Sequence, residues 1–197
     1  MPVNSTPIGE IAAIRMGITL RGRDATRPDP NGSCRMIRIG DVTDHGSLHA
    51  GELLQFEPSD PVKPDHFLRA GDILFPNRGL RTAACVFDLP VTNVLVGAQF
   101  FILRVNPGAA LPAYVAWFLR SDTAAAHFNE RRKGTLVQTL QRRDIEELAL
   151  PLPSLAKQAT IVALDALAVQ ERKLSSKLSQ LKSISLQHRL LCAASHS

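Results

Sequence analysis

The sequence predicts an α+β fold: a mixed-sheet domain followed by one long C-terminal coiled-coil helix. Patterns typical of strands and of helices are mixed over residues 1–150 without a strict βαβ alternation. All 13 prolines lie at or before Pro153 and all 12 glycines at or before Gly134, so no helix breaker follows them. A chain of 197 residues with 45% hydrophobic content suits one ordinary domain and an appendage. We therefore expect a domain over residues 1–150 and a long helix over residues 151–197.

The first element that we expect is a short helix. Thr6 stands at a capping position, Pro7 can begin the helix, and Gly17 can end it. Isoleucines at positions 8, 11 and 14 would share one face. Residues 18–34 then form a polar loop with several strong turn formers in its second half.

Strands are predicted over residues 35–39, 83–89 and 99–105, because these runs are rich in β-branched, aromatic and other apolar side chains. The segment "GDILF" is typical of a turn that leads into a buried strand, with Gly71 and Asp72 shaping the turn. Pro112 begins a second helix, "PAYVAWFLRS", which we expect to continue through "DTAAAHFNER". Trp117 and Phe118 should fill the core beneath it.

The long helix begins after Ser154, which stands at a capping position, and nothing interrupts helical geometry before Cys192. At about 1.5 Å per residue it would be about 57 Å long. With Leu164 at heptad position a, the a and d positions through Leu181 are apolar except at Glu171. The residues that we expect to meet a partner helix are Ile161, Leu164, Leu167, Leu174, Leu178, Leu181, Ile184 and Leu191. The same pattern also fits a helix folded back on its own domain.

Composition excludes several classes of protein. The longest apolar run, residues 94–103, is about half of what a membrane-spanning helix needs. The start, "MPVNSTP", lacks the features of a secretory signal, so we expect a cytoplasmic protein with no membrane partner. The three cysteines, Cys34, Cys85 and Cys192, show no CxxC spacing and suit small buried apolar residues in a reducing compartment.

The basic residues of the domain are mostly arginine. Residues 151–197 hold six Lys or Arg against two Asp or Glu, whereas residues 1–150 hold seventeen against sixteen. Fifteen of those seventeen are Arg, the side chain suited to bidentate contacts with guanine edges and phosphates. A GC-rich genome, which favours Arg codons, explains the same composition without any binding role.

A search for catalytic residues finds no plausible set. The sequence contains neither GxGxxG nor GxxxxGK[ST]. His45 and His49 lie close to Asp41 and Asp44, but Gly46 favours a solvated turn over a helical metal site, so we expect no metal. Glu171 and Lys173 have the spacing of a nuclease motif, yet they lie on the heptad helix rather than on a strand. The chain is therefore predicted to bind rather than to catalyse.

The segment "NERRKGTLVQTLQRR" indicates what is bound. Its basic residues surround a glycine-centred turn, and two glutamines follow that can reach base edges. Further pairs of arginines lie beside glycines in "LRGR" and "NRGLR". The competing interpretation of the first segment is a solvated charged surface, because Glu130, Asp144, Glu146 and Glu147 lie in the same region.

Five segments along the chain together resemble a known protein family. The segments "IGEIAAIRMG", "RIGDV", "GDILFPNRG", "PAYVAWFLRS" and above all "GTLVQTLQRRDIEELALPLPSLAKQATIV" occur in this order. They resemble one target-recognition half of the specificity subunit of type I restriction-modification systems, over essentially the whole chain. The resemblance implies that residues 1–150 are a DNA target-recognition domain and that residues 151–197 are a spacer and dimerisation helix.

The resemblance also implies partners and a role in a bacterial or archaeal cytoplasm. Such subunits carry no catalysis of their own; they bind double-stranded DNA and direct methyltransferase subunits, and through them a restriction subunit, to half of a bipartite site. We expect no cofactor on this chain and S-adenosylmethionine on the methyltransferase. The expected DNA contacts are Arg21, Arg23, Arg78, Arg81, Arg131, Arg132, Lys133, Gln138 and Gln141.

The sequence departs from the family in one respect. Familiar members carry two recognition domains and two helices that pair antiparallel, whereas this chain has one of each. Because an apolar stripe facing water is unfavourable, we expect two copies to associate head to tail and to read an interrupted palindrome. The alternative is a coiled-coil adaptor whose globular head binds protein and not DNA; an independent enzyme ranks third.

Overall fold

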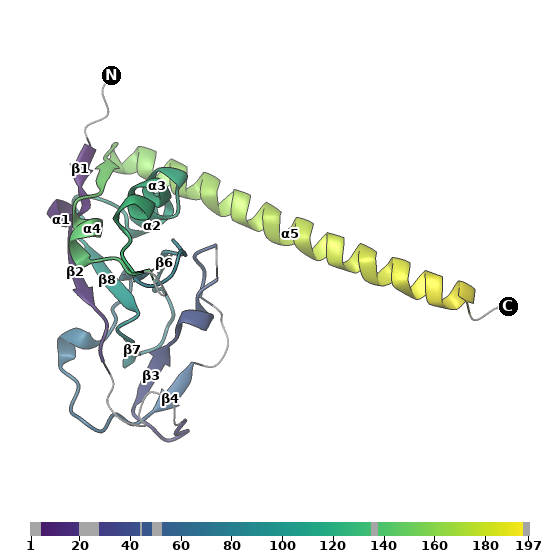
Figure 1. The fold of residues 1–197 in the computed structure, drawn as a ribbon, viewed down its shortest axis with the longest axis horizontal. Coiled ribbons are helices and arrows are strands. Elements are labelled where there is room, and N and C mark those ends of the chain that lie inside the picture. The colour runs from purple at the N-terminus through teal and green to yellow at the C-terminus, as the bar shows by residue number, and fades with distance from the viewer. Residues whose placement is uncertain (1–4, 20–27, 44, 49–52, 135–137, 195–197) are drawn as a thin grey trace. The chain divides into compact units, whose positions relative to one another are not determined.

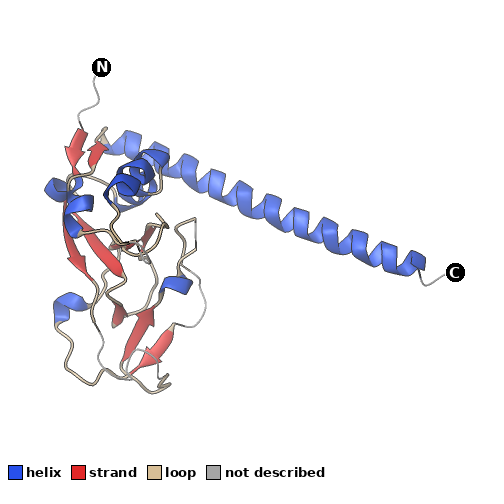
Figure 2. Cartoon of the chain, viewed as in Figure 1, coloured by secondary structure: helices blue, strands red, loops and turns tan. Residues whose placement is uncertain are grey.

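The computed structural model describes residues 5–19, 28–43, 45–48, 53–134 and 138–194. The chain divides into two compact units, Met1–Ala159 and Thr160–Ser197. The first unit contains strands and short helices, and the second continues a single helix (Figures 1 and 2). This is the α+β class that the sequence predicts. None of the described helices is long and apolar enough to cross a membrane.

The described residues of the first unit form three sheets, and their strands come from distant parts of the chain. A four-stranded sheet has the order β2 (Ala12–Met16), β8 (Phe100–Val105), β5 (Ile73–Pro76) and β6 (Cys85–Val86), with antiparallel neighbours throughout. A three-stranded sheet has the order β4 (Leu54–Phe56), β3 (Cys34–Ile37) and β7 (Val94–Val96). In it β3 pairs with β4 antiparallel and with β7 parallel, so the sheet is mixed.

The third sheet joins the start of the unit to its end. Strand β1 (Ser5–Pro7) pairs antiparallel with β9 (Ala149–Pro151), and Ser5 lies opposite Pro151. The hydroxyl of Tyr114 donates to the carbonyl of Pro151 at 2.7 Å. The strand that precedes the long helix is therefore fastened to the unit from two directions.

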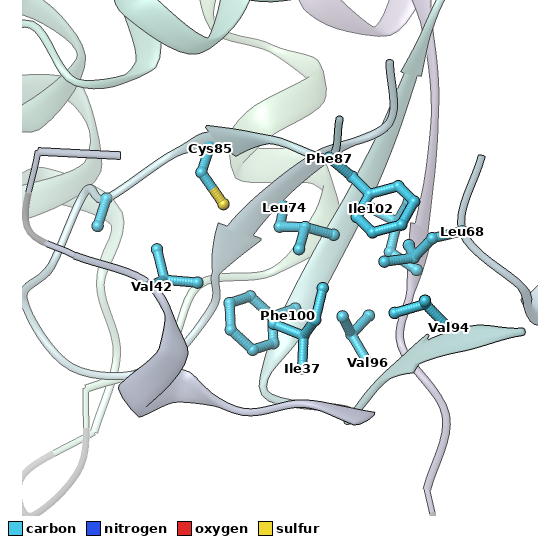
Figure 3. Close-up of a cluster of buried hydrophobic side chains, with 11 residues drawn as sticks. Ile37, Val42, Leu68, Leu74, Cys85, Phe87, Val94, Val96, Phe100 and Ile102 are labelled. Carbon is cyan, nitrogen blue, oxygen red and sulfur yellow. The ribbon is translucent and has the colours of Figure 1, made fainter. Parts of the chain in front are cut away.

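The main core lies between the four-stranded and the three-stranded sheets (Figure 3). Leu74 and Ile102 contribute from the larger sheet, and Ile37, Val94 and Val96 from the smaller one. Side chains alternate along β5, so Ile73 and Phe75 point to the opposite face, where Phe75 packs on Phe128 with ring centroids 5.0 Å apart. The uninterrupted burial of β5 follows from its having packed layers on both faces.

Helices follow the last strand of the larger sheet. They are α2 (Pro112–Leu119), α3 (Asp122–Arg131) and α4 (Arg142–Glu146). The predicted helix from Pro112 is confirmed, but its predicted continuation is wrong, because the Ser121 hydroxyl accepts a hydrogen bond from the amide of Ala124 at 3.3 Å and begins a separate helix. Phe118 is buried as expected, and Trp117 is only partly buried and stacks on Tyr114.

The predicted helix over residues 7–16 is wrong beyond its first turn. Helix α1 spans only Ile8–Ile11, has no side-chain cap, and passes directly into β2. Thr6 pairs with Leu150 in a strand instead of capping a helix. Residues 12–16 alternate between the two faces of a sheet as readily as they follow a helical stripe, and the five residue pairs that β2 makes with β8 decide the outcome.

The predicted strands at residues 35–39, 83–89 and 99–105 are confirmed as β3, β6 and β8, although β3 ends at Ile37 and β6 is only two residues long. The turn predicted at residues 71–72 leads into β5 as expected. Gly71 adopts φ +89°, and the Asp72 carboxylate accepts a hydrogen bond from the amide of Arg69 at 2.9 Å, so both residues shape the turn before β5 as expected. Cys34 and Cys85 are buried thiols, and burial raises the pKa of Cys85 to about 12. Cys192 is exposed, contrary to the expectation of a buried residue.

Helix α5 spans Leu155–Ala194, and its unbroken length confirms the predicted helix. The Ser154 hydroxyl accepts a hydrogen bond from the amide of Lys157 at 3.4 Å, as expected of a helix cap. The first turn belongs to the first compact unit, in which Gln158 is fully buried. Its side-chain oxygen accepts from the amide of Leu111, and its side-chain nitrogen donates to the carbonyl of Pro153, both at 2.9 Å.

Candidate nucleic-acid interface

Two of the predicted basic clusters lie side by side in the structure. Residues 77–81 follow β5, whereas residues 131–134 and 138–141 lie between α3 and α4. We call these three segments together the paired-turn surface. Thr139 is in antiparallel bridges with both Arg78 and Lys133, so one residue joins the two clusters. Both clusters stand out in the sequence, but nothing in the sequence places them together.

Backbone hydrogen bonds hold the paired-turn surface together. The amide of Gly79 donates to the carbonyl of Gln138 at 2.8 Å, and the amide of Leu140 donates to the carbonyl of Asn77 at 3.0 Å. Lys133 and Thr139 exchange both of their backbone hydrogen bonds. Gly79 adopts φ +77°, a conformation that a side chain would strain. The basic side chains of this surface are therefore carried by backbone segments that hydrogen bonds hold in place.

Arg132 stabilises the neighbouring turn. Its guanidinium donates to the carbonyls of Gly79 and Leu80, the second at 3.3 Å. Desolvation by burial lowers the pKa of this guanidinium from its ordinary value. A planar guanidinium can hold two carbonyls at once, which is how Arg132 joins the end of α3 to residues 79–80.

Like Arg132, Arg81 uses its guanidinium to hold two backbone carbonyls. Its guanidinium donates to the carbonyl of Ile39 at 3.3 Å and to that of Val42 at 2.6 Å. Arg131 donates to the carbonyl of His127 at 3.2 Å and lies 3.6 Å from the carboxylate of Glu130. These guanidiniums are thus oriented by the protein itself.

Arg78 and Lys133 are the exposed cations of the surface. Among the residues that the structure describes, no carboxylate lies within ion-pair distance of either side chain. Gln138 and Gln141 are exposed on the same surface. Arg21 and Arg23 lie outside the described residues, so their expected role stays a prediction.

The acidic residues near this surface are mostly engaged elsewhere. Within α4, Glu146 pairs with Arg142 at 3.0 Å, and Glu147, which follows the helix directly, pairs with Arg143. The Asp144 carboxylate accepts from the amide of Gln141 at 2.6 Å and caps that helix. The acids therefore neutralise Arg142 and Arg143 and leave Arg78 and Lys133 available to an anionic ligand.

A second feature, which sequence analysis did not single out, is an open hollow of about 920 Å³ beside the three-stranded sheet. Its polar lining includes Arg35, Arg38, Asp41 and Gln55, and its apolar lining includes Leu54 and Leu89. The guanidinium of Arg35 donates to the carbonyl of Thr92 at 3.4 Å. The only signal in the sequence was the pair of arginines in "RMIRI", three residues apart on a predicted strand.

Arg81 connects the hollow to the paired-turn surface. The segment that its guanidinium contacts, residues 39–42, contains Asp41, which lines the hollow. Two basic features of the first unit are thereby joined through one side chain.

Among the described residues, no three His, Cys, Asp or Glu side chains are grouped so as to hold an ion. Asp44 and His49 of the histidine segment lie outside the described residues.

Comparison with known proteins gives structural matches only. No protein-family model and no curated protein matches the sequence. The HsdS subunit from Thermoanaerobacter tengcongensis superposes with a TM-score of 0.61 at 21% identity, over 87% of this chain and 39% of that one. The type I restriction-modification S subunit from M. genitalium gives 0.56 at 17% identity, over 90% and 42%.

A third match is a chain of a solved structure that is described as the structural basis of complex assembly and conformational transition of the type I R-M system. Its TM-score is 0.66 at 19% identity, over 96% of this chain and 44% of that one. The chain thus spans less than half the length of each of these proteins. Along most of its length, this chain has the fold of the S subunits of type I restriction-modification systems.

Proposed function

We propose that this chain is a DNA-specificity subunit of a type I restriction-modification system and reads one half of a bipartite site. The observation that carries the proposal is the S-subunit fold, which extends over 87% of the chain in the first match. The paired-turn surface supports it, because its exposed cations stand on a backbone held by hydrogen bonds and face no described carboxylate. Such cations can contact phosphates, and nearby glutamines can reach base edges.

The contacts divide the predicted DNA-binding residues into two roles. Arg78, Lys133, Gln138 and Gln141 are exposed and are assigned to the DNA. Arg132 and Arg81 are assigned to positioning, since their guanidiniums hold backbone carbonyls of the turn and of residues 39–42. Residues of the hollow, Arg35 among them, extend the proposed contact surface.

The DNA-binding role is tested by salt dependence. Binding of the chain to a mixed-sequence DNA duplex should weaken steeply with salt, because each neutralised phosphate adds about 0.9 to the log–log slope. Replacing Arg78 and Lys133 together by alanine should lower the magnitude of that slope by about 1.8. Fluorescence anisotropy between about 50 and 200 mM salt, a range over which phosphate contacts change affinity by orders of magnitude, measures the slope of the parent chain and of the double variant.

The matched control removes two charges that the protein already neutralises. Replacing Arg142 and Arg143 by alanine takes away the same formal charge, but each of these side chains pairs with a glutamate four residues later. We expect the slope of this variant to stay near that of the parent chain. Equal slopes for both double variants would remove the paired-turn surface from the DNA interface. A coiled-coil adaptor would show no salt-dependent binding in any variant.

The subunit is proposed to have no catalytic activity and no cofactor of its own. It directs methyltransferase subunits to the site and, through them, a restriction subunit; S-adenosylmethionine would be bound by the methyltransferase. A cytoplasmic location fits such partners.

Two copies are proposed to associate through α5 and to read an interrupted palindrome. From Leu164 onward, the leucines of the helix are more than half exposed, and burying apolar surface contributes about 25 cal/mol per Å². Light scattering at micromolar concentration should therefore report twice the mass of one chain. Substituting aspartate for both Leu178 and Leu181 should give the mass of one chain, with an unchanged far-ultraviolet spectrum of the folded domain. A parent chain that is monomeric under these conditions would contradict the pairing.

A further inference from the structure

The exposed seam of α5 contains one acid and one imidazole at mirrored places. With Leu164 at position a, the seam continues through Leu167, Glu171, Leu174, Leu178, Leu181, Ser185, His188 and Cys192. All of these side chains are exposed. Three leucines, Leu174, Leu178 and Leu181, separate Glu171 from Ser185 and His188 along the seam, so the two ionisable layers lie on either side of an apolar centre.

We propose that two copies of α5 pair antiparallel about an axis between residues 179 and 180, with Glu171 of each copy facing His188 of the other. This inference rests on the proposed association of two copies. In a two-fold pair, residue i faces j and j faces i, and in antiparallel heptads position a faces position d. The axis therefore places Leu178 against Leu181, Leu174 against Ser185, and Leu167 against Cys192.

The Glu171–His188 layer selects this register over its neighbours. Moving one helix by a heptad places His188 opposite Leu164 or opposite Leu178. Either shift leaves the imidazole against hydrocarbon and Glu171 without its partner, which is unfavourable for a buried polar group. A single polar layer is known to fix register in coiled coils in the same way.

The charges also oppose a parallel pair. In that arrangement Glu171 would face Glu171 of the second copy, and Lys177 at position g would flank Lys182 at position e. Like charges set opposite each other disfavour an interface. In the antiparallel register, Lys177 instead flanks Ile184, and Lys182 flanks Ser175. Orientation and register are thus decided by the same few side chains.

Disulfide cross-linking of the full chain tests the register. In the proposed pair, a cysteine at position 167 lies against the native Cys192 of the second copy, so Leu167→Cys should form a covalent dimer under mild oxidation. The two positions lie about 37 Å apart along one helix, far beyond the roughly 7 Å that a disulfide spans, so the bond has to be between copies. Reducing and non-reducing gels measure it.

Leu174→Cys is the matched control, because Leu174 is as exposed as Leu167, at 60% against 62%, and lies in the same seam. In the proposed register it faces Ser185, and we expect no covalent dimer. Cross-linking of Leu174→Cys through Cys192 would show a register shifted by one heptad and would overturn the assignment. Cross-linking that persists after Cys192→Ser in either variant would show a parallel pair and would also overturn it.

A charge exchange tests the polar layer itself. Glu171→Lys alone sets a lysine against His188, and His188→Glu alone sets two glutamates together. Each should weaken dimerisation about tenfold or more, because the first removes the carboxylate that the imidazole contacts and the second sets two like charges together. Combining the two substitutions restores a basic residue opposite a carboxylate, and the dimerisation constant should return to within about threefold of the parent value. Sedimentation equilibrium measures all four proteins, and an additive double variant would refute the contact.

These measurements are made without DNA. If the chain cross-links as expected but does not bind DNA, the result supports the proposed pairing and contradicts the proposed function. If the chain binds DNA with the expected salt slope but shows none of the expected cross-links, the result contradicts only the proposed pairing.

Discussion

Asp72→Ala is expected to lower the free energy of unfolding by up to about 3–5 kcal/mol, because removing the buried partner of an ion pair leaves partly buried charge without compensation. The side chains of Arg104 and Arg15 are 31% and 27% exposed. Asp72 is 1% exposed. Its two carboxylate oxygens accept hydrogen bonds from the guanidinium of Arg104 at 2.8 and 2.7 Å, and one of them also accepts from the amide of Arg69. The hydrogen bonds to Asp72 raise the pKa of Arg104.

A second cation makes the loss larger. The guanidinium of Arg15 lies 3.9 Å from the Asp72 carboxylate, and desolvation by burial lowers the pKa of Arg15 from its ordinary value. Arg15 and Arg104 lie on the adjacent strands β2 and β8, two residue pairs apart, and without Asp72 neither would keep an ion pair with a described acid. Breaking this network therefore affects the centre of the four-stranded sheet.

Urea unfolding followed by circular dichroism measures the effect. Asp65→Ala is the control, because Asp65 also pairs with an arginine, at 3.3 Å, but its side chain is 88% exposed. Such surface pairs are worth about 0–1 kcal/mol, so the control should stay near the parent stability. A loss below about 1 kcal/mol for Asp72→Ala would mean that solvent replaces the carboxylate.

Gln158→Ala is expected to cost about 2–4 kcal/mol of unfolding free energy, because its removal leaves the amide of Leu111 and the carbonyl of Pro153 without partners and opens a cavity. The side chain is fully buried, and both ends of its amide are used. Each backbone group that finds no hydrogen-bond partner in solvent after the substitution contributes about 1–3 kcal/mol to the lost stability.

Two further variants separate the causes. Gln158→Met keeps the volume and loses the hydrogen bonds, so most of the loss should remain. Lys157→Ala changes an exposed neighbour in the same turn and should have an effect within about 0.5 kcal/mol. Thermal and urea unfolding of the full chain measure the three. A methionine variant as stable as the parent would show that packing, not the amide, holds this turn.

The parts of the fold that the sequence predicts are those in which a single local signal is strong. Strand β8 has a long run of apolar residues, α2 begins at a proline, and α5 has no helix breaker over 40 residues. Residues 12–16 fit a helix and a strand equally, and only the pairing with β8 decides between them. The separation of α2 from α3 depends on one serine hydroxyl whose capping role competes with continued helix.

The candidate site was predictable in its composition and not in its geometry. Glycine next to arginine marked residues 77–81 and 131–134, because such turns recur where backbone approaches a ligand. That Arg132 and Arg81 hold carbonyls 53 and 39 residues away along the chain depends on tertiary structure alone. The hollow beside the three-stranded sheet is likewise formed by residues from segments that are distant in sequence.

The pairing of β1 with β9 has a consequence for how such a unit can be inherited. The chain enters the first compact unit and leaves its sheets at neighbouring strands, with Ser5 opposite Pro151. Units whose two ends lie together tolerate circular permutation and insertion into longer polypeptides. A gene duplication could therefore join two of them in tandem, and a permuted chain could be opened elsewhere, without either copy having to rearrange its strand order.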